Sequence, residues 1–363
     1  MKRVFIIGYN NSKGGVETYM DHLAAALPQY HFVYSLPTME IDGKVWHRPP
    51  NRHRYLLYRF FWHRFFKENH FDVLYYNTCD VVSIDMLKFA KKAGIPIRVI
   101  HSHNSGTQQA IGGRLSLFHR FTEAHNRKVL DRYATHFFAC SQKAGDWMFD
   151  GRPYTVIRNG IDLDLYAFRP EKRKELRQSL GLKDELLAGI VGRLSLQKNP
   201  AFAVKVLQAL AEKEPTAHAV FLGDGELRSQ TEESVRAAGL QDRVRFLGNV
   251  GNVNEWLSAM DVLLMPSLFE GLPFALVEAQ ASGLPCVVSS AVSKEADLTG
   301  LVQFVSLDEK PTVWADKIIQ AHRSSRPDTT WQLTEAGYSI QDTARKVSSI
   351  LEEGMIKFQG GKA

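Results

Sequence analysis

The chain has 363 residues, 44% hydrophobic and 23% charged, which is typical of a soluble globular protein long enough for two domains. Its formal net charge of +6 is uneven, because residues 1–165 hold 22 Lys and Arg against 14 Asp and Glu, a net +8, which leaves −2 for the remainder. No segment reaches the roughly 18 apolar residues of a membrane-spanning helix, and the first apolar run stops at Gly8, so a cytoplasmic protein without a signal peptide is expected.

Short runs of β-branched and aromatic residues recur along the chain, with segments of helical period between them. They lack the polar–apolar alternation of half-exposed strands, which favours parallel strands covered on both faces. The expected strands are 3–8, 31–36, 71–77, 96–103, 136–141 and 154–160, then 186–193, 217–225, 243–248, 261–267, 285–290 and 302–307. Two sets of about six predict an α/β protein of two doubly wound, Rossmann-like domains, with ligands bound beyond the carboxyl ends of the strands.

The predicted domains are 1–165 and 166–340, and the chain crosses between them near 158–170. Asn159-Gly160 is a turn signal there, and Pro170 begins a charged helix. An amphipathic helix over about 340–358 is expected to pack back on the first domain. Three isolated cysteines (Cys79, Cys140 and Cys286) form no C-x-x-C pair, so they indicate neither disulfides nor a zinc site and are expected in the core.

The first candidate site follows the first strand. Gly14 and Gly15 stand where a helix begins, and they would let the backbone approach a phosphate or a sugar closely. Taken alone this signal is weak, because the G-x-G-x-x-G spacing is missing, and Glu17 is expected to be a helix-start charge. The missing spacing also disfavours a nicotinamide dehydrogenase.

Residues 48–70 combine six Arg and Lys with seven aromatic residues. A basic, aromatic, amphipathic helix of this kind can lie on an anionic membrane surface. The alternative is a helix whose rings pack on the first sheet while its arginines are solvated. Nucleic-acid binding is not expected, because no recognisable module accompanies the segment.

Two motifs invite a metal hypothesis. His101 and His103 end the fourth predicted strand, but no third ligand is suitably spaced, so either a site residue or a satisfied core histidine is expected instead. Asp162 and Asp164 imitate a metal-binding D-x-D motif beside the crossover. No metal and no cofactor are expected.

In the second half, Gly192, Arg193 and Lys198 follow a strand in "VGRLSLQKN". The stretch "FEGLPFALVEAQASG" (269–283) then predicts a helix over about 273–282, with Glu270 in the loop before it and Glu278 inside it. A helix N-terminus attracts anions, and a carboxylate among apolar residues is costly unless it has a use. The structural alternative has Glu270 capping the helix and Glu278 on a polar stripe with Ser282.

These motifs resemble the G-R-x-x-x-x-K and E-x7-E elements of the retaining, nucleotide-sugar-dependent glycosyltransferases with the GT-B fold, glycosyltransferase family four, which includes many capsule and exopolysaccharide enzymes. The resemblance covers most of the chain and implies two domains facing each other across a cleft. It implies that Arg193 and Lys198 stabilise the departing diphosphate, that Glu270 and the backbone of Gly271, Leu272, Pro273 and Phe274 hold the donor sugar, and that Glu278 holds the ribose. Gly14 and Gly15 would close over the diphosphate, and His103 would lie near the donor sugar. The pair Asp162 and Asp164 would be structural.

The resemblance thus implies a retaining transferase that moves a sugar from a nucleoside diphosphate, with uridine diphosphate expected, to a glycan or lipid-linked acceptor in polysaccharide assembly. Peripheral binding to the inner face of the membrane is a further expectation. Alternatives are a nucleotide-sugar epimerase or phosphorylase of the same shape, and a non-catalytic sugar-nucleotide-binding partner of a transferase. Donor consumption without acceptor, phosphate dependence, or binding without turnover would distinguish them.

Overall fold

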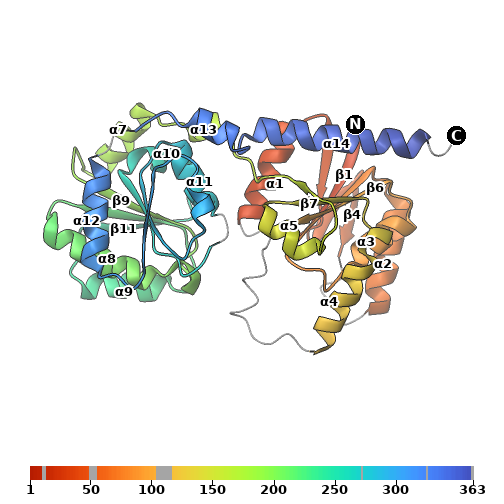
Figure 1. The fold of residues 1–363 in the computed structure, drawn as a ribbon, viewed down its shortest axis with the longest axis horizontal. Coiled ribbons are helices and arrows are strands. Elements are labelled where there is room, and N and C mark those ends of the chain that lie inside the picture. The colour runs from red at the N-terminus through yellow and green to blue at the C-terminus, as the bar shows by residue number, and fades with distance from the viewer. Residues whose placement is uncertain (10–13, 49–54, 104–116, 271–272, 324–325, 361–363) are drawn as a thin grey trace. The chain divides into compact units, whose positions relative to one another are not determined.

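In the computed structural model the chain forms two compact α/β units (Figure 1): Met1–Ile161 with Gly337–Ala363, and Asp162–Ala336. The structure describes residues 1–9, 14–48, 55–103, 117–270, 273–323 and 326–360. All twelve expected strands are present in two parallel sheets, so the prediction of two Rossmann-like domains is confirmed. The chain leaves the first unit four residues before the predicted boundary at 165 and returns at Gly337.

The first unit is built on a six-stranded parallel sheet of order β2-β1-β5-β6-β7-β8. Its strands are β1 (Lys2–Ile7), β2 (Tyr30–Tyr34), β5 (Val73–Thr78), β6 (Ile97–Ser102), β7 (His136–Ala139) and β8 (Thr155–Val156). The helices are α1 (Gly15–Ala26), α2 (Tyr55–Glu68), α3 (Asp85–Lys92), α4 (Leu117–Val129), α5 (Gln142–Phe149) and α14 (Ile340–Gly360). A core of aromatic and aliphatic side chains joins α2, α3 and α5 to one face of the sheet.

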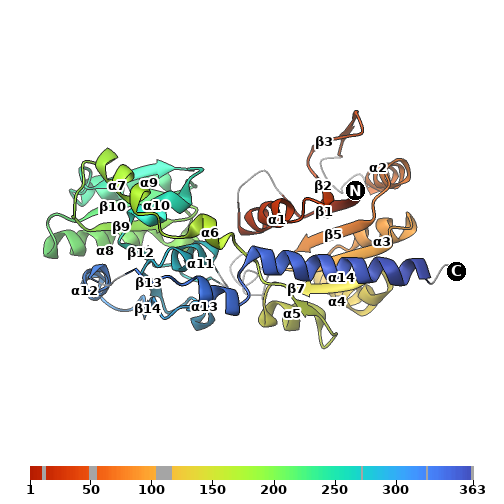
Figure 2. The same cartoon turned by 90° about the horizontal axis from the view of Figure 1, so that it is seen from above.

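Helix α14 belongs to the first unit, where it contacts α1 and β6 and runs to the C-terminus (Figure 2). The two chain crossovers lie side by side, because Ile161 N donates to Tyr338 O at 2.9 Å and Ile340 N donates to Ile161 O at 2.9 Å. A side chain at Gly160 would place its Cβ 2.9 Å from Ile340 Cα, so this contact requires glycine.

The sequence interpretation missed one hairpin, β3 (Thr38–Ile41) with β4 (Lys44–His47). Its turn residues Asp42 and Gly43 both have positive φ, +53° and +75°, as a two-residue hairpin turn requires. Met39, Ile41 and Trp46 are buried in the core of the unit. The Asp-Gly pair was the available signal for this hairpin.

The second unit has a parallel sheet of order β11-β10-β9-β12-β13-β14. The strands are β9 (Leu187–Val191), β10 (His218–Leu222), β11 (Val244–Gly248), β12 (Val262–Met265), β13 (Cys286–Ser289) and β14 (Val302–Val305). One core joins the sheet to α8 (Pro200–Lys213), α9 (Arg228–Ala237) and α12 (Pro311–His322). The remaining helices are α6 (Leu163–Tyr166), α7 (Pro170–Ser179), α10 (Val253–Ala259), α11 (Phe274–Ala281) and α13 (Thr330–Glu335).

The strand order of the second unit reverses between β9 and β12, its first and fourth strands. At such a switch point the loops after the two strands diverge, and ligands of open α/β sheets bind there. The predicted GRxxxxK and E-x7-E motifs follow these two strands.

The three cysteines differ in burial. Cys286 is buried as predicted, whereas Cys140 is half-buried and Cys79 is exposed in the segment after β5, so the prediction of three core cysteines is wrong. Across the described ranges, no helix combines the length and apolar character needed to cross a membrane.

Candidate donor-binding site

The loops after β9 and β12 are held together at the switch point. Leu268 N donates to Gln197 O at 2.8 Å, and Gln197 Nε2 donates to Phe269 O at 3.1 Å. These two bonds fix the backbone that precedes Glu270 against the backbone that carries Lys198. The two motifs are 72 residues apart at their linking bond, yet form one site.

Lys198 and Glu270 form an ion pair, with Nζ 2.6 Å from Oε1. Their side chains are 22% and 10% exposed, so water screens the pair only in part. The capping alternative for Glu270 is wrong, because Pro273 is the N-cap of α11 and makes no side-chain cap. Helix α11 starts one residue later than predicted, and Gly271 and Leu272 lie outside the described residues.

Close backbone approach at the switch point depends on glycine. Gly192 has φ +137°, and a Cβ there would lie 3.0 Å from Lys198 Cε. A Cβ at Gly223 would lie 2.2 Å from Gly192 O, and one at Gly225 would lie 2.4 Å from Leu194 O. Glycine at these positions lets the loops after β9 and β10 touch, and this sets the path of Lys198 over Gly192.

Arg193 lies apart from the Lys198–Glu270 pair. Its side chain is 73% exposed, and Nε lies 3.1 Å from Glu226 Oε2, which is itself 53% exposed. Exposed pairs of this kind contribute little to stability, so the guanidinium can exchange this partner for an anion at low cost.

Glu278 is buried in α11 at 7% exposure, so the alternative of a polar surface stripe is wrong. Tyr166 Oη, from α6, donates to Glu278 Oε1 at 3.0 Å. Burial raises the pKa of Glu278 to about 7, although the Tyr166 hydrogen bond and the Lys198 charge act in the opposite direction. The group is therefore near its midpoint at neutral pH.

In the first unit, Gly14 is the N-cap of α1, and its carbonyl oxygen accepts from Thr18 N at 3.0 Å. Gly15 is the first residue of that helix. Glu17 lies in the first turn as expected, but it is buried at 7% exposure. The glycines therefore stand at a helix N-terminus after β1, which is a site suited to anions.

His103 follows β6 and contacts Asn77 of β5, with Nε2 2.8 Å from Oδ1. Asn77 Nδ2 donates to Ile7 O at 3.2 Å, so the amide oxygen faces the imidazole. Since Oδ1 only accepts, His103 Nε2 carries the proton. Burial lowers the pKa of His103 to about 3, which leaves it neutral with Nδ1 as an acceptor. Nδ1 is buried and has no hydrogen-bond partner in the described chain.

The metal alternatives find no support in the described residues, where no cluster of three or more His, Cys, Asp and Glu could hold an ion. Asp162 caps α6 by accepting from Leu165 N at 3.0 Å. His101 is fully buried, and its Nδ1 lies 2.9 Å from Tyr75 Oη.

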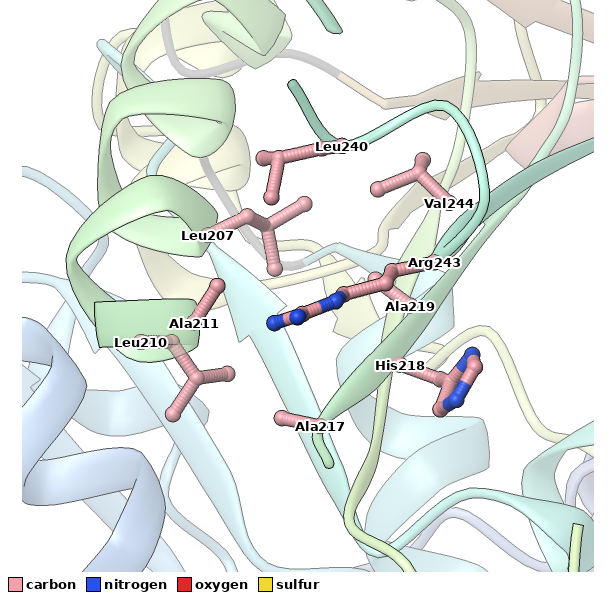
Figure 3. A pocket seen from close by; sticks show the side chains of 9 residues that line it. All are labelled: Leu207, Leu210, Ala211, Ala217, His218, Ala219, Leu240, Arg243 and Val244. Carbon is pink, nitrogen blue, oxygen red and sulfur yellow. The ribbon is translucent and has the colours of Figure 1, made fainter. Parts of the chain in front are cut away.

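A small apolar hollow lies elsewhere in the second unit (Figure 3), between α8 and the segments that begin β10 and β11. Leu207 and Leu240 line it, with Arg243 and His218 beside them. The starts of these strands form the opposite edge of the sheet from the loops that carry Lys198 and Glu270. The hollow is therefore separate from the candidate donor site.

Sequence reasoning missed Tyr166, Gln197 and Asn77. Tyr166 and Asn77 make side-chain contacts to predicted site residues that are distant in sequence, and no local motif reports such contacts. Gln197 lies at a position of the GRxxxxK element for which the motif specifies no residue type.

Comparisons with known proteins agree with this fold. Residues 172–353 match the family Glycosyl transferases group 1, and residues 13–165 match Glycosyltransferase Family 4. The chain is 36% identical over 262 residues to a putative glycosyltransferase EpsF of Bacillus subtilis, covering 69% of this chain and 67% of that one. It is 31% identical to an Escherichia coli UDP-Gal:alpha-D-GlcNAc-diphosphoundecaprenol alpha-1,3-galactosyltransferase, covering 55% of this chain and 53% of the relative.

Among solved structures, Anabaena Alr3699/HepE in complex with UDP and glucose superposes with a TM-score of 0.72 at 18% identity, covering 97% of this chain and 99% of that one. This likeness shows a shared fold, that of the GT-B glycosyltransferases. The chain belongs to the group 1 glycosyltransferase family, and it is a glycosyltransferase.

Proposed function

We propose that this glycosyltransferase takes a sugar from a nucleoside diphosphate sugar, with uridine diphosphate as the nucleotide, and transfers it with retention of configuration. The acceptor is a glycan or lipid-linked saccharide of cell-surface polysaccharide assembly. The observation that carries the proposal is the Lys198–Glu270 ion pair at the switch point, beside the helix that buries Glu278. The Escherichia coli relative, whose name states a UDP-galactose donor and a diphosphoundecaprenol-linked acceptor, supports the substrate classes.

The chemistry follows from the charges at the site. Cleavage of a sugar–diphosphate bond through an oxocarbenium-like state builds negative charge on the leaving phosphate. Lys198 and the exposed Arg193 supply two cations for that charge, so no metal or cofactor is required. Glu270 orients the sugar hydroxyls, and the assignment extends to backbone groups of residues 271–274, of which Gly271 and Leu272 lie outside the described residues.

The remaining roles concern the nucleoside and the first unit. Glu278 accepts from the ribose hydroxyls, and Gly14 and Gly15 offer backbone N–H groups to the diphosphate. The neutral His103 accepts a hydrogen bond at Nδ1 from a hydroxyl group of the donor sugar. The acceptor attacks on the face that the diphosphate vacates, and a diphosphate oxygen takes the acceptor proton, so no protein nucleophile is needed.

Turnover by Lys198→Ala and Arg193→Ala at saturating donor tests this assignment. Loss of a group that stabilises transition-state charge lowers kcat by about 10²–10³-fold. Lys205→Ala is the matched control, since Lys205 is an exposed lysine of the neighbouring helix α8. Turnover equal to wild type in both site variants would refute the assignment. A thermal-shift screen of nucleotide sugars identifies the donor, and NMR of the product anomer decides between retention and inversion.

The exposed end of α2 supports a second proposal, peripheral binding to an anionic membrane surface. Trp62, Phe65 and Phe66 of this helix are core residues, as the packing alternative expected. Another face of α2, however, exposes Tyr55 (48%), Leu56 (78%), Leu57 (55%) and Phe60 (67%). Arg59, His63, Arg64 and Lys67 are exposed on the same helix. Apolar groups flanked by cations suit the interface of an anionic bilayer.

Flotation with vesicles of phosphatidylglycerol and phosphatidylcholine tests the membrane proposal. Wild-type protein is expected to float with anionic vesicles, and a Leu56→Asp, Phe60→Ser variant is expected to stay behind. Trp331→Ser is the control, because Trp331 is 71% exposed on α13 of the other unit. Equal flotation of wild type and the α2 variant would refute a role for this helix.

A further inference from the structure

Glu278 depends on one neighbour for its hydrogen bonding. Its carboxylate lies in the middle of α11 between Val277 and Ala279, which are both buried. In the part of the chain that the structure describes, Tyr166 Oη is the donor that reaches this carboxylate, at 3.0 Å to Oε1, and none reaches Oε2. A carboxylate offers two acceptor oxygens, so Oε2 can accept from a ligand hydroxyl while Tyr166 donates to Oε1.

Tyr166 is itself held firmly. It ends the short helix α6, where its backbone N donates to Asp162 O at 3.2 Å, and this helix contacts both α10 and α11. The ring is buried at 7% exposure. Burial and the nearby negative charge of Glu278 raise the pKa of Tyr166, so the hydroxyl stays protonated and acts as the donor.

We propose that Tyr166 is a positioning residue for donor binding: it holds Glu278 Oε1 so that Oε2 of the ionised carboxylate is left to accept from the nucleoside part of the donor. This inference rests on the proposed function, because it assigns Glu278 to the nucleoside. It adds that nucleotide binding is coupled to loss of the Glu278 proton. A phenylalanine at 166 would fill the same space but would remove the hydrogen bond to Glu278 Oε1.

Other ionisable groups on the neighbouring elements are accounted for. Lys198, after β9, favours the ionised form of Glu278 through its charge and is paired with Glu270. On α10, Glu255 accepts from Asn252 and pairs with Lys172. Asp162 caps α6, and the Cys286 thiol of β13 donates to Leu284 O at 3.1 Å. Tyr166 is the hydrogen-bond donor among them, so its hydroxyl is the group to remove.

The test compares wild type, Tyr166→Phe, Glu278→Gln and the control Tyr338→Phe, each as the full chain. Tyr338 is 1% exposed in the first unit, and its hydroxyl accepts from Arg158 Nη1 at 3.1 Å, so the control loses a buried hydroxyl of the other unit. The first readout is the Glu278 carboxyl titration by carbon-13 NMR, assigned by its disappearance in Glu278→Gln. Loss of a hydrogen bond to a charged group raises the pKa by about one unit, so Tyr166→Phe is expected to do this and Tyr338→Phe is not.

The second readout is the dissociation constant of UDP from about pH 6 to 9. Wild-type binding is expected to tighten as the pH rises through 7, and Tyr166→Phe is expected to bind about fivefold more weakly near pH 7 and to approach wild type near pH 9. Glu278→Gln is expected to lose this pH dependence. An unchanged Glu278 titration in Tyr166→Phe, or a shifted titration with unchanged UDP binding, would overturn the inference. If wild type binds no UDP, the proposed function is overturned instead. The NMR titration separates the two outcomes, because it reports the Tyr166–Glu278 bond without any ligand.

Discussion

Replacing Glu278 with Gln measures what it costs the fold to keep a carboxylate in α11. Burial raises the pKa of Glu278 from 4.5 to about 7, so the folded state binds this proton more tightly than the unfolded chain does. The resulting stability is fully present below about pH 4.5 and is lost as the pH rises through 7. The whole contribution of this proton to the free energy of unfolding is about 3 kcal/mol, and about 2 kcal/mol of it is lost between pH 5.5 and 8.5.

Gln keeps an oxygen for Tyr166 and cannot ionise. The free energy of unfolding of Glu278→Gln, relative to that of wild type, should therefore rise by about 2 kcal/mol between about pH 5.5 and 8.5. For a unit of this size that is a relative rise in Tm of about 4–8 °C. Calorimetry of the full chain at several pH values measures it, with Glu171→Gln, at an exposed position of α7, as control. A Glu278→Gln difference that stays constant with pH would refute the raised pKa.

Two further predictions concern the frame of the site. Gly192→Ala should lower the stability of the protein more than Gly181→Ala does, and only Gly192→Ala should weaken nucleotide binding. Both glycines have positive φ, but only at 192 would the new Cβ meet Lys198. Equal effects of the two substitutions in denaturation and binding assays would contradict this. Arg177→Met should destabilise the protein by about 3 kcal/mol, because it removes a buried partner 3.0 Å from Asp261. The UDP affinity of the folded protein should stay unchanged. Urea unfolding measures the stability and calorimetry the affinity, and a loss of affinity would count against a purely structural role for Arg177.

The sequence was informative where the physics is local. Uninterrupted apolar runs predicted both parallel sheets, and Glu278 was recognisable because a carboxylate interrupts an apolar helix. Glu270 and Lys198 were each predicted from their motifs, but their direct pairing was not, since it depends on strand order in the sheet. The hairpin of β3 and β4 was not predicted although Asp42-Gly43 signalled it, because each of its strands has only four residues and so gives a weak pattern.

Long-range contacts of single side chains mark the limit of local reasoning. Tyr166 reaches Glu278 across 112 residues of sequence, and nothing within either segment specifies the other. The aspartates before Tyr166 drew attention as a possible metal motif, whereas Asp162 only caps the helix that places the tyrosine ring. The residue to which we assign the positioning of Glu278 therefore lies at a position that the aspartate pattern did not emphasise.

Each charged group of the candidate site has a partner within the second unit. Lys198 is paired with Glu270, Arg193 with Glu226, and Glu278 accepts from Tyr166. A bound diphosphate would replace the carboxylate partner of each cation. Each cation would then exchange one anion for another with little change in its solvation, and Glu270 would be released to bind hydroxyl groups. Because both cations begin paired, binding exchanges ion pairs and does not simply add them. Neutralising Glu226 should therefore strengthen diphosphate binding through Arg193, whereas Glu270→Gln should free Lys198 but remove the group that orients the sugar.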